Sequence, residues 1–150
     1  MENKLDIIDI FELVEKHFKG IVDKANKPYV GHLYRVYENV LKSGGDFEQQ
    51  VIALLHDSVE DLPHIFTIEM LNNYFSKRII DGILAMTKIK GESYGDYINR
   101  LISNKDAIKV KIADLKDNMD ITRFTEVELL EKDLIRLKKY HNTYLKLIKL

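Results

Sequence analysis

The stretch VIALLHDSVED, residues 51–61, runs from five apolar side chains directly into a cluster of ionisable ones. Read as a helix at about 100° per residue, it places its main apolar positions on one arc. The opposite arc carries an imidazole and three carboxylates, which belong to His56, Asp57, Glu60 and Asp61. The stretch therefore predicts an amphipathic helix that is buried on one face and strongly acidic on the other.

A solvated acidic surface is the simplest interpretation of that second face. Like charges at helical spacings of three and four residues repel each other, however. No lysine or arginine lies between Lys42 and Lys77 to relieve the repulsion. A cation supplied from outside the local sequence would relieve it, so we interpret the acidic face as part of a functional site.

The composition of the 150-residue chain indicates one compact, soluble globular domain, which we expect over residues 1–150. Hydrophobic residues make up 45% of the chain and charged residues 31%, which excludes a disordered protein. The formal net charge of -1 creates no field for nucleic acid or an anionic membrane, so we expect neither as a partner. The N-terminal MENKLDIIDI lacks the apolar core of a signal peptide, and no apolar run reaches membrane-spanning length. These features predict a cytoplasmic protein.

The spacing of apolar residues by three and four, with only two prolines and seven glycines, predicts an all-α fold. We expect helices over residues 5–19, 29–43, 47–61, 67–74, 77–87, 94–103, 105–120 and 126–148. Three residue pairs resemble the capping boxes that begin helices, namely Asp46 with Gln49, Ser93 with Asp96, and Thr125 with Glu128.

A metal beside His56 and Asp57 needs further ligands, and the absence of cysteine leaves histidines and carboxylates to supply them. Asp114 emerges from the most apolar part of its helix, where a carboxylate without a cation would be costly. His32 lies near the start of another helix and fits a ligand or an ordinary core or cap position. Two histidines and two aspartates suit Mn²⁺, Fe²⁺, Co²⁺ or Zn²⁺ rather than Ca²⁺. Such a set leaves positions for water and a substrate oxygen.

The order of a histidine, an adjacent His-Asp pair and a distant aspartate resembles the HD superfamily of metal-dependent phosphohydrolases. HDSVED (56–61) is similar to the HD-x-x-ED segment of the ppGpp hydrolase domain of the Rel/SpoT family. KPYVGH (27–32), TKI (87–89) and IADLKDN (112–118) resemble its PY-x-x-H, VTK and LAD-x-x-x-N segments, so the likeness covers roughly residues 18–123. It implies a single HD-domain bundle of about seven to eight helices. It also implies a Mn²⁺-dependent hydrolase that removes the 3′-pyrophosphate from ppGpp and pppGpp.

The same resemblance implies a role for each matched residue. The implied metal ligands are His32, His56, Asp57 and Asp114. The implied catalytic acids are Glu60 and Asp61, and the implied substrate contacts are Lys24 and Asn118. Mn²⁺ is the implied cofactor, with other divalent transition metals possible, and the implied partner is a nucleotide substrate.

Two positions depart from the family pattern. Asp23 stands where the family usually has an arginine stacked on guanine, and Asn26 replaces a glycine in the same loop. A carboxylate at position 23 favours an alternative, an HD phosphohydrolase that acts on another nucleotide such as NADPH. A non-catalytic nucleotide-sensing module is a second alternative, which the retained acidic pair of Glu60 and Asp61 disfavours. The sequence specifies neither an oligomeric state nor which of these two acids donates a proton.

Overall fold

The computed structural model describes residues 4–150, and these residues form one helical bundle. No strand occurs within this range, where the only β-type pairing is an isolated bridge between Val22 and Pro28. The predicted all-α fold is therefore confirmed. The expected domain range of 1–150 also includes residues 1–3, which lie outside the described residues.

The helices of the described chain follow the apolar spacing closely. Their bounds are α1 (Ile7–Phe18), α2 (Tyr29–Lys42), α3 (Phe47–Leu55), α4 (Ser58–Asp61), α5 (Ile68–Tyr74), α6 (Lys77–Met86), α7 (Tyr94–Leu101), α8 (Lys105–Asn118) and α9 (Glu131–Leu147), with a 3₁₀ helix η1 at Ile121–Arg123. Within residues 4–150 no helix is long and apolar enough to cross a membrane.

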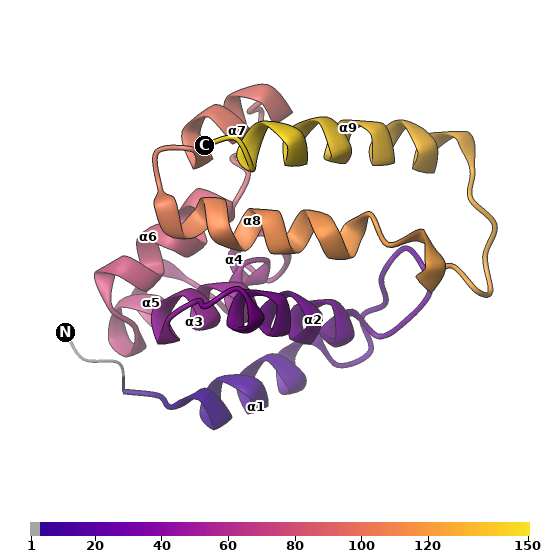
Figure 1. Cartoon of the computed structure of the whole chain (residues 1–150). Helices are drawn as coiled ribbons and strands as arrows, with labels where there is room; N and C mark the ends of the chain where they lie inside the picture. Colours follow the sequence, from indigo (N-terminus) through magenta and orange to yellow (C-terminus); the bar gives the residue numbers. More distant parts are fainter. Residues whose placement is uncertain (1–3) are drawn as a thin grey trace.

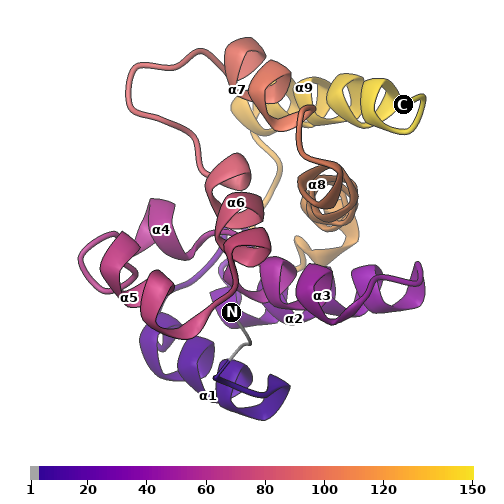
Figure 2. The same ribbon diagram turned by 90° about the vertical axis from the view of Figure 1, so that its left-hand side faces the viewer.

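Helix α3 lies at the centre of the bundle and packs against α1, α2, α6 and α8 (Figure 1). Its residues 51–55 are all fully buried, so the C-terminal half of the helix is enclosed on every side and not on one face alone. Gly82 allows α6 to approach closely, because a Cβ at that position would lie 2.4 Å from Ile52 Cδ1. Figure 2 looks along α8, which lies between α9 and the layer formed by α2 and α3.

The expected helix over 47–61 is wrong at one point, because the chain turns at His56 and Asp57. Helix α3 ends at Leu55, and α4 begins at Ser58 after Asp57, whose φ of -100° and ψ of -1° leave the helical range. The hydroxyl of Ser58 donates to the carbonyl oxygen of Leu55 and stabilises this turn. Adjacent side chains of a continuous helix diverge by about 100°. The turn instead brings His56 Nε2 within 3.0 Å of Asp57 Oδ2.

Two of the three expected capping signals are confirmed. Asp46 accepts the backbone N–H of Gln49 in a reciprocal capping box. Ser93 accepts the backbone N–H of Asp96. These contacts fix where α3 and α7 begin.

The third signal, Thr125 with Glu128, does not begin a helix. Helix α9 starts at Glu131. The side chain of Asp133, in its first turn, caps this start by accepting the backbone N–H of Leu130. The preceding stretch is tied to the 20–28 loop by ion pairs that no local pattern reveals, including Lys27 with Glu126 at 3.0 Å. These long-range contacts compete with the helix expected from residue 126.

Candidate metal centre and its cavities

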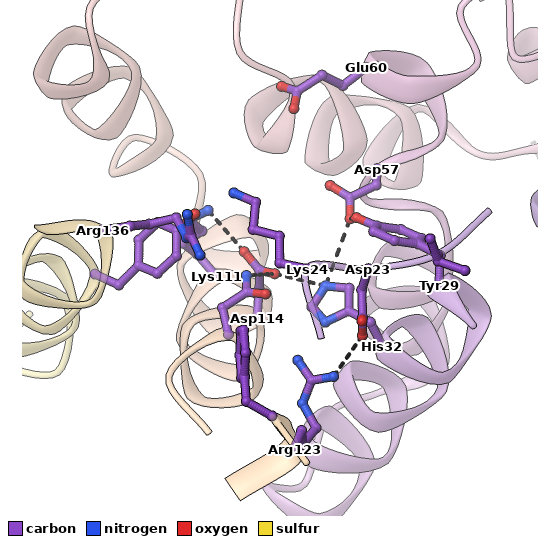
Figure 3. A pocket seen from close by; sticks show the side chains of 14 residues that line it. Asp23, Lys24, Tyr29, His32, Asp57, Glu60, Lys111, Asp114, Arg123 and Arg136 are labelled. Carbon is purple, nitrogen blue, oxygen red and sulfur yellow. Dashed lines mark hydrogen bonds and ion pairs between the residues drawn. The ribbon is translucent and has the colours of Figure 1, made fainter. Parts of the chain in front are cut away.

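The four expected ligands come from α2, the α3–α4 turn and α8, and their side chains converge (Figure 3). Asp114 and Asp57 both lie near His32. Its Nε2 is 3.0 Å from Asp114 Oδ1 and 3.8 Å from Asp57 Oδ2. His56 Nε2 lies 3.0 Å from Asp57 Oδ2 and 3.4 Å from Asp114 Oδ1. The structure therefore brings all four residues to one point.

These distances fit a shared divalent metal. Ligand bonds of about 2.1 Å place two ligands about 3.0 Å apart at a right angle and about 3.4 Å apart at the tetrahedral angle. His32, His56 and Asp57 offer ligand atoms that all lie within 4.8 Å of one another. Asp114 lies outside this set of three, but its Oδ1 is 3.0 Å from His32 Nε2 and 3.4 Å from His56 Nε2. The donor set is the nitrogen and oxygen mixture that transition metals accept.

The Nε2 atom of His56 gives a second, independent indication. It is buried and has no hydrogen-bond partner among residues 4–150, although the oxygens of Asp57 and Asp114 are close. Neither oxygen meets the geometry of a hydrogen bond with Nε2 despite the short distances. A buried polar atom without a partner is costly, and a metal ion at that point would satisfy it.

Contacts on the far side of each imidazole hold Nε2 toward the centre. His56 Nδ1 lies 2.6 Å from the carbonyl oxygen of Ala53, which can only accept, so Nδ1 carries the proton. His32 Nδ1 lies 2.6 Å from Asp117 Oδ2. Asp117 Oδ1 also accepts from Arg35 Nε at 2.6 Å. Histidine ligands of metals have such outer partners, which orient the ring and raise its basicity.

We expect Asp117→Asn to weaken metal affinity by roughly 10- to 100-fold, the usual effect of losing an outer partner of a ligand. The single amide oxygen could not accept from both His32 and Arg35, as the carboxylate does. Titration of metal against a chelating dye would measure the change. Asp106→Asn is the matched control, since Asp106 lies on the same helix but pairs with Arg78 at 2.8 Å, outside the site. Equal affinities in both variants would contradict the role of Asp117.

The carboxylates of the centre are also held by neighbours. The Tyr29 hydroxyl donates to Asp57 Oδ2. Lys111 Nζ lies 2.9 Å from Asp114 Oδ2, and the Asn118 amide donates to Asp114 Oδ1 at 2.9 Å. Asn118, expected to contact substrate, thus also orients a ligand.

The buried carboxylates and imidazoles of the centre shift one another's pKa values. Burial opposes ionisation of Asp114, yet Lys111 and the two histidines hold its pKa well below the usual value. Burial likewise opposes protonation of His56, but Asp57 and Asp114 raise its pKa well above the usual value. The carboxylates therefore stay charged and ready to bind a cation, and metal binding must displace protons from the imidazoles.

The centre lies at the boundary of two cavities, of about 410 Å³ and 230 Å³. His32 lines the larger cavity and His56 the smaller one. The residues that line both include Asp57, Asp114 and Glu60. A substrate could therefore extend to either side of the metal.

Cationic side chains line both cavities beside the carboxylates of the centre. Lys24 lines the larger one with Arg136, and burial with the nearby charges of Arg136 and Lys139 lowers the pKa of Lys24. Lys139 lines the smaller cavity, with its Nζ 4.4 Å above the ring of Tyr94. Cations that repel one another in a concave site attract an anionic ligand.

The two acids of α4 take different positions. Glu60 lines both cavities, and its Oε1 accepts the backbone N–H of Lys88 at 2.8 Å. In Figure 3 it lies across the larger cavity from Arg123. Asp61 lines neither of these two cavities. Loss of surrounding water, with the carboxylates of Asp57 and Glu60, raises the pKa of Asp61 to about 6.

Asp23 does not present an unpaired negative charge to the larger cavity. Its carboxylate is largely buried and pairs with Arg123 Nη1 at 2.7 Å, so the negative charge is compensated. Burial opposes ionisation, but backbone N–H groups and Arg123 lower the pKa of Asp23. Asn26 adopts a φ of 60°, a left-handed conformation that asparagine tolerates better than most residues, so it can replace glycine there.

No family model matches the chain. A probable GTP pyrophosphokinase of Mycobacterium leprae is 27% identical over 127 residues, which are 79% of this chain and 16% of that protein. A guanosine-3′,5′-bis(diphosphate) 3′-pyrophosphohydrolase of Aquifex aeolicus is 30% identical over 104 residues, 64% of this chain and 15% of that protein. The bifunctional (p)ppGpp synthase/hydrolase SpoT of Escherichia coli is 26% identical over 110 residues, 67% and 16% of the two chains.

The chain thus spans 15 to 16% of the length of these curated relatives. A solved structure of a metazoan ortholog of SpoT that hydrolyses ppGpp has the same fold, with a TM-score of 0.74 and 19% sequence identity. That likeness covers 93% of this chain and 83% of the other. The expected resemblance to the hydrolase domain of Rel/SpoT proteins is confirmed.

Proposed function

We propose that the chain, over residues 1–150, is a metal-dependent HD phosphohydrolase domain that removes the 3′-pyrophosphate from ppGpp-like alarmones. One observation carries this proposal: two histidines and two aspartates meet at the boundary of two cavities lined by cations. The names of the relatives support the substrate class. We also propose Mn²⁺ as the metal, because the mixed donor set suits it.

His32, His56, Asp57 and Asp114 would hold the metal. A divalent metal held there would supply the activation of water as a nucleophile. The chain keeps the ligands in place through Asp117, Tyr29 and Lys111, so they need little rearrangement on binding.

The chain must also supply a proton, because cleavage of a ribose–phosphate bond expels an alkoxide, which is a poor leaving group. We assign this task to the acidic pair of α4. Glu60 contacts both cavities and is oriented by the N–H of Lys88. Asp61, with its pKa raised to about 6, is protonated in roughly a tenth of the molecules at pH 7, far more than an ordinary aspartate. The pair can therefore protonate the leaving oxygen.

The cations around the centre would bind the phosphate groups. Lys24 and Lys139 form no ion pair with a carboxylate within the described chain. Both pKa values are lowered by burial and by neighbouring positive charges, and an anion would relieve that repulsion. A diphosphate nucleotide offers such charge on both sides of its ribose.

The alternatives from the sequence lose support. Another nucleotide was favoured by a carboxylate at position 23, but Asp23 is paired with Arg123 and does not present a bare charge to the cavity. A sensing module would need the cations but not an acid at the junction of both cavities, where Glu60 lies.

We expect the Mn²⁺-loaded protein to convert ppGpp into GDP and pyrophosphate in equal amounts. The measurement is incubation with ppGpp, pppGpp, ppApp and NADPH, followed by separation of products on an anion-exchange column. The same incubation with excess chelator serves as the control. Release of phosphate from NADPH without any pyrophosphate from ppGpp would replace the proposed substrate with the alternative one.

A further inference from the structure

Arg123 forms part of the wall of the larger cavity and lies beside two carboxylates of the protein. Its Nη1 lies 2.7 Å from Asp23 Oδ2, and its Nη2 lies 3.7 Å from Asp117 Oδ2. Its Nε is buried without a hydrogen-bond partner among residues 4–150. The Nη1 donor of the guanidinium is therefore taken by Asp23, and the planar group itself forms part of the wall that a ligand in this cavity would meet.

The plane of this guanidinium is held firmly because its main anchor is itself fixed. Asp23 Oδ1 accepts the backbone N–H groups of Ala25 at 2.9 Å and Lys27 at 3.0 Å. Asp23 Oδ2 is thereby directed at Arg123 (Figure 3). A preorganised planar group loses little conformational freedom when a ligand stacks on it.

Charge separates this wall from the phosphate-binding part of the cavity. Arg123 lies near two carboxylates, so its positive charge is compensated. Lys24, in the same cavity, has no ion-pair partner within the described chain. An anionic phosphate is attracted to Lys24, whose charge is uncompensated. A neutral, flat base is better matched to Arg123, whose charge is compensated and whose guanidinium is planar. Guanidinium groups stack on aromatic rings in this way.

We propose that Arg123 is a specificity-determining residue on whose face the base of the bound nucleotide stacks. This inference rests on the proposed function for the identity of the ligand as a nucleotide. It assigns the base to the part of the larger cavity formed by Arg123 and Phe124, with the phosphates toward Lys24 and the metal ligands. Asp23 acts as a positioning residue for Arg123.

The test compares the binding of GDP, which has a base, with that of pyrophosphate, which has none. Arg123→Lys keeps the charge but removes the plane. We expect the Kd for GDP to rise roughly 3- to 30-fold, the range of a stacking or cation–π contact, with the Kd for pyrophosphate unchanged. Calorimetry on Mn²⁺-loaded protein measures both, and metal content is checked in each variant.

Two further variants separate stacking from a structural role. Arg78→Lys is the matched control, because Arg78 also pairs with carboxylates, including Asp106 at 2.8 Å, yet does not line either cavity. We expect it to leave the ratio of the two Kd values unchanged. Asp23→Asn retains the oxygen that accepts from Ala25 and Lys27 but turns an amide toward Arg123. We expect it to weaken GDP and not pyrophosphate.

Each outcome decides the inference. Equal weakening of GDP and pyrophosphate in Arg123→Lys, an unchanged GDP Kd, or no GDP binding by the unaltered protein would overturn it. The proposed function is tested separately by hydrolysis. If ppGpp is not cleaved but Arg123→Lys selectively loses GDP affinity, the proposed function fails and the stacking role stands. If ppGpp is cleaved and the GDP Kd does not change, the stacking role fails alone.

Discussion

Asp114→Asn is expected to abolish both metal binding and hydrolysis. Asp114 Oδ1 lies within 3.4 Å of both histidine Nε2 atoms, while its Oδ2 bonds Lys111 at 2.9 Å. An asparagine would turn its NH₂ group either toward the imidazoles or toward Lys111. The lysine is itself a donor, and an imidazole Nε2 that binds a metal has no free lone pair, so neither can accept a hydrogen bond from that group. The site would also lose one negative charge of two, and with it most of its attraction for a divalent cation.

Elemental analysis after dialysis should give about one transition metal per chain for the unaltered protein and almost none for Asp114→Asn. The variant is also expected to unfold at a lower temperature, because breaking a buried ion pair typically costs about 3–5 kcal/mol and Lys111 is largely buried. Circular dichroism at the assay temperature shows whether it is folded. Asp81→Asn is the control, since Asp81 is exposed and pairs with Lys77 on the same helix, away from the centre. Full metal occupancy in folded Asp114→Asn would remove Asp114 from the centre.

The ligands could be predicted because their signals are local. The His56-Asp57 pair follows a fully apolar run, and Asp114 interrupts another one, so each stands out within a few residues of sequence. The same holds for most helices, whose apolar spacing and caps, such as Asp46 with Gln49, depend on neighbours three or four positions away. The resemblance of four sequence segments to the hydrolase domain of the Rel/SpoT family then groups ligands that lie far apart in the chain into one predicted site.

The residues that support the ligands could not be predicted in the same way. Asp117 holds His32, and Arg123 holds Asp23, across 85 and 100 positions of sequence. Asp117 is three residues from Asp114 and so shares a side of α8, which is a weak signal that the sequence offered. Arg123 offered none, because its partner is set by how the 20–28 loop meets η1. The turn at Asp57 was hidden for a related reason, since helical spacing continues through it.

These contacts also change the meaning of Asp23. Taken alone, a carboxylate in a nucleotide pocket indicates a loss of anion binding. With Arg123 2.7 Å away, it instead fixes a planar cation in the wall of the same cavity. The charge of a single residue is therefore a poor guide to specificity when its partner is distant in sequence.

The acidic pair of α4 separates proton transfer from metal binding, and Glu60→Gln is expected to lower turnover by about 10²- to 10⁴-fold with metal content unchanged. Glu60 lines both cavities without being among the metal-ligand atoms. Glutamine keeps an oxygen that can accept the N–H of Lys88, so the side chain stays in place while its acidity is lost. Steady-state kinetics at saturating Mn²⁺ measures kcat.

Asp61→Asn decides which acid donates the proton. Position favours Glu60, whereas the pKa of about 6 favours Asp61. Geometry ranks first for a proton donor, so we expect Asp61→Asn to lose less turnover than Glu60→Gln. A donor must be protonated, so if Asp61 were the acid, kcat would fall as the pH rises through about 6, and Asp61→Asn would abolish that fall. A larger loss in Asp61→Asn, together with disappearance of the pH dependence, would assign the proton to Asp61 and leave Glu60 to position the substrate. Near-normal turnover in both variants would show that the leaving oxygen takes its proton from neither.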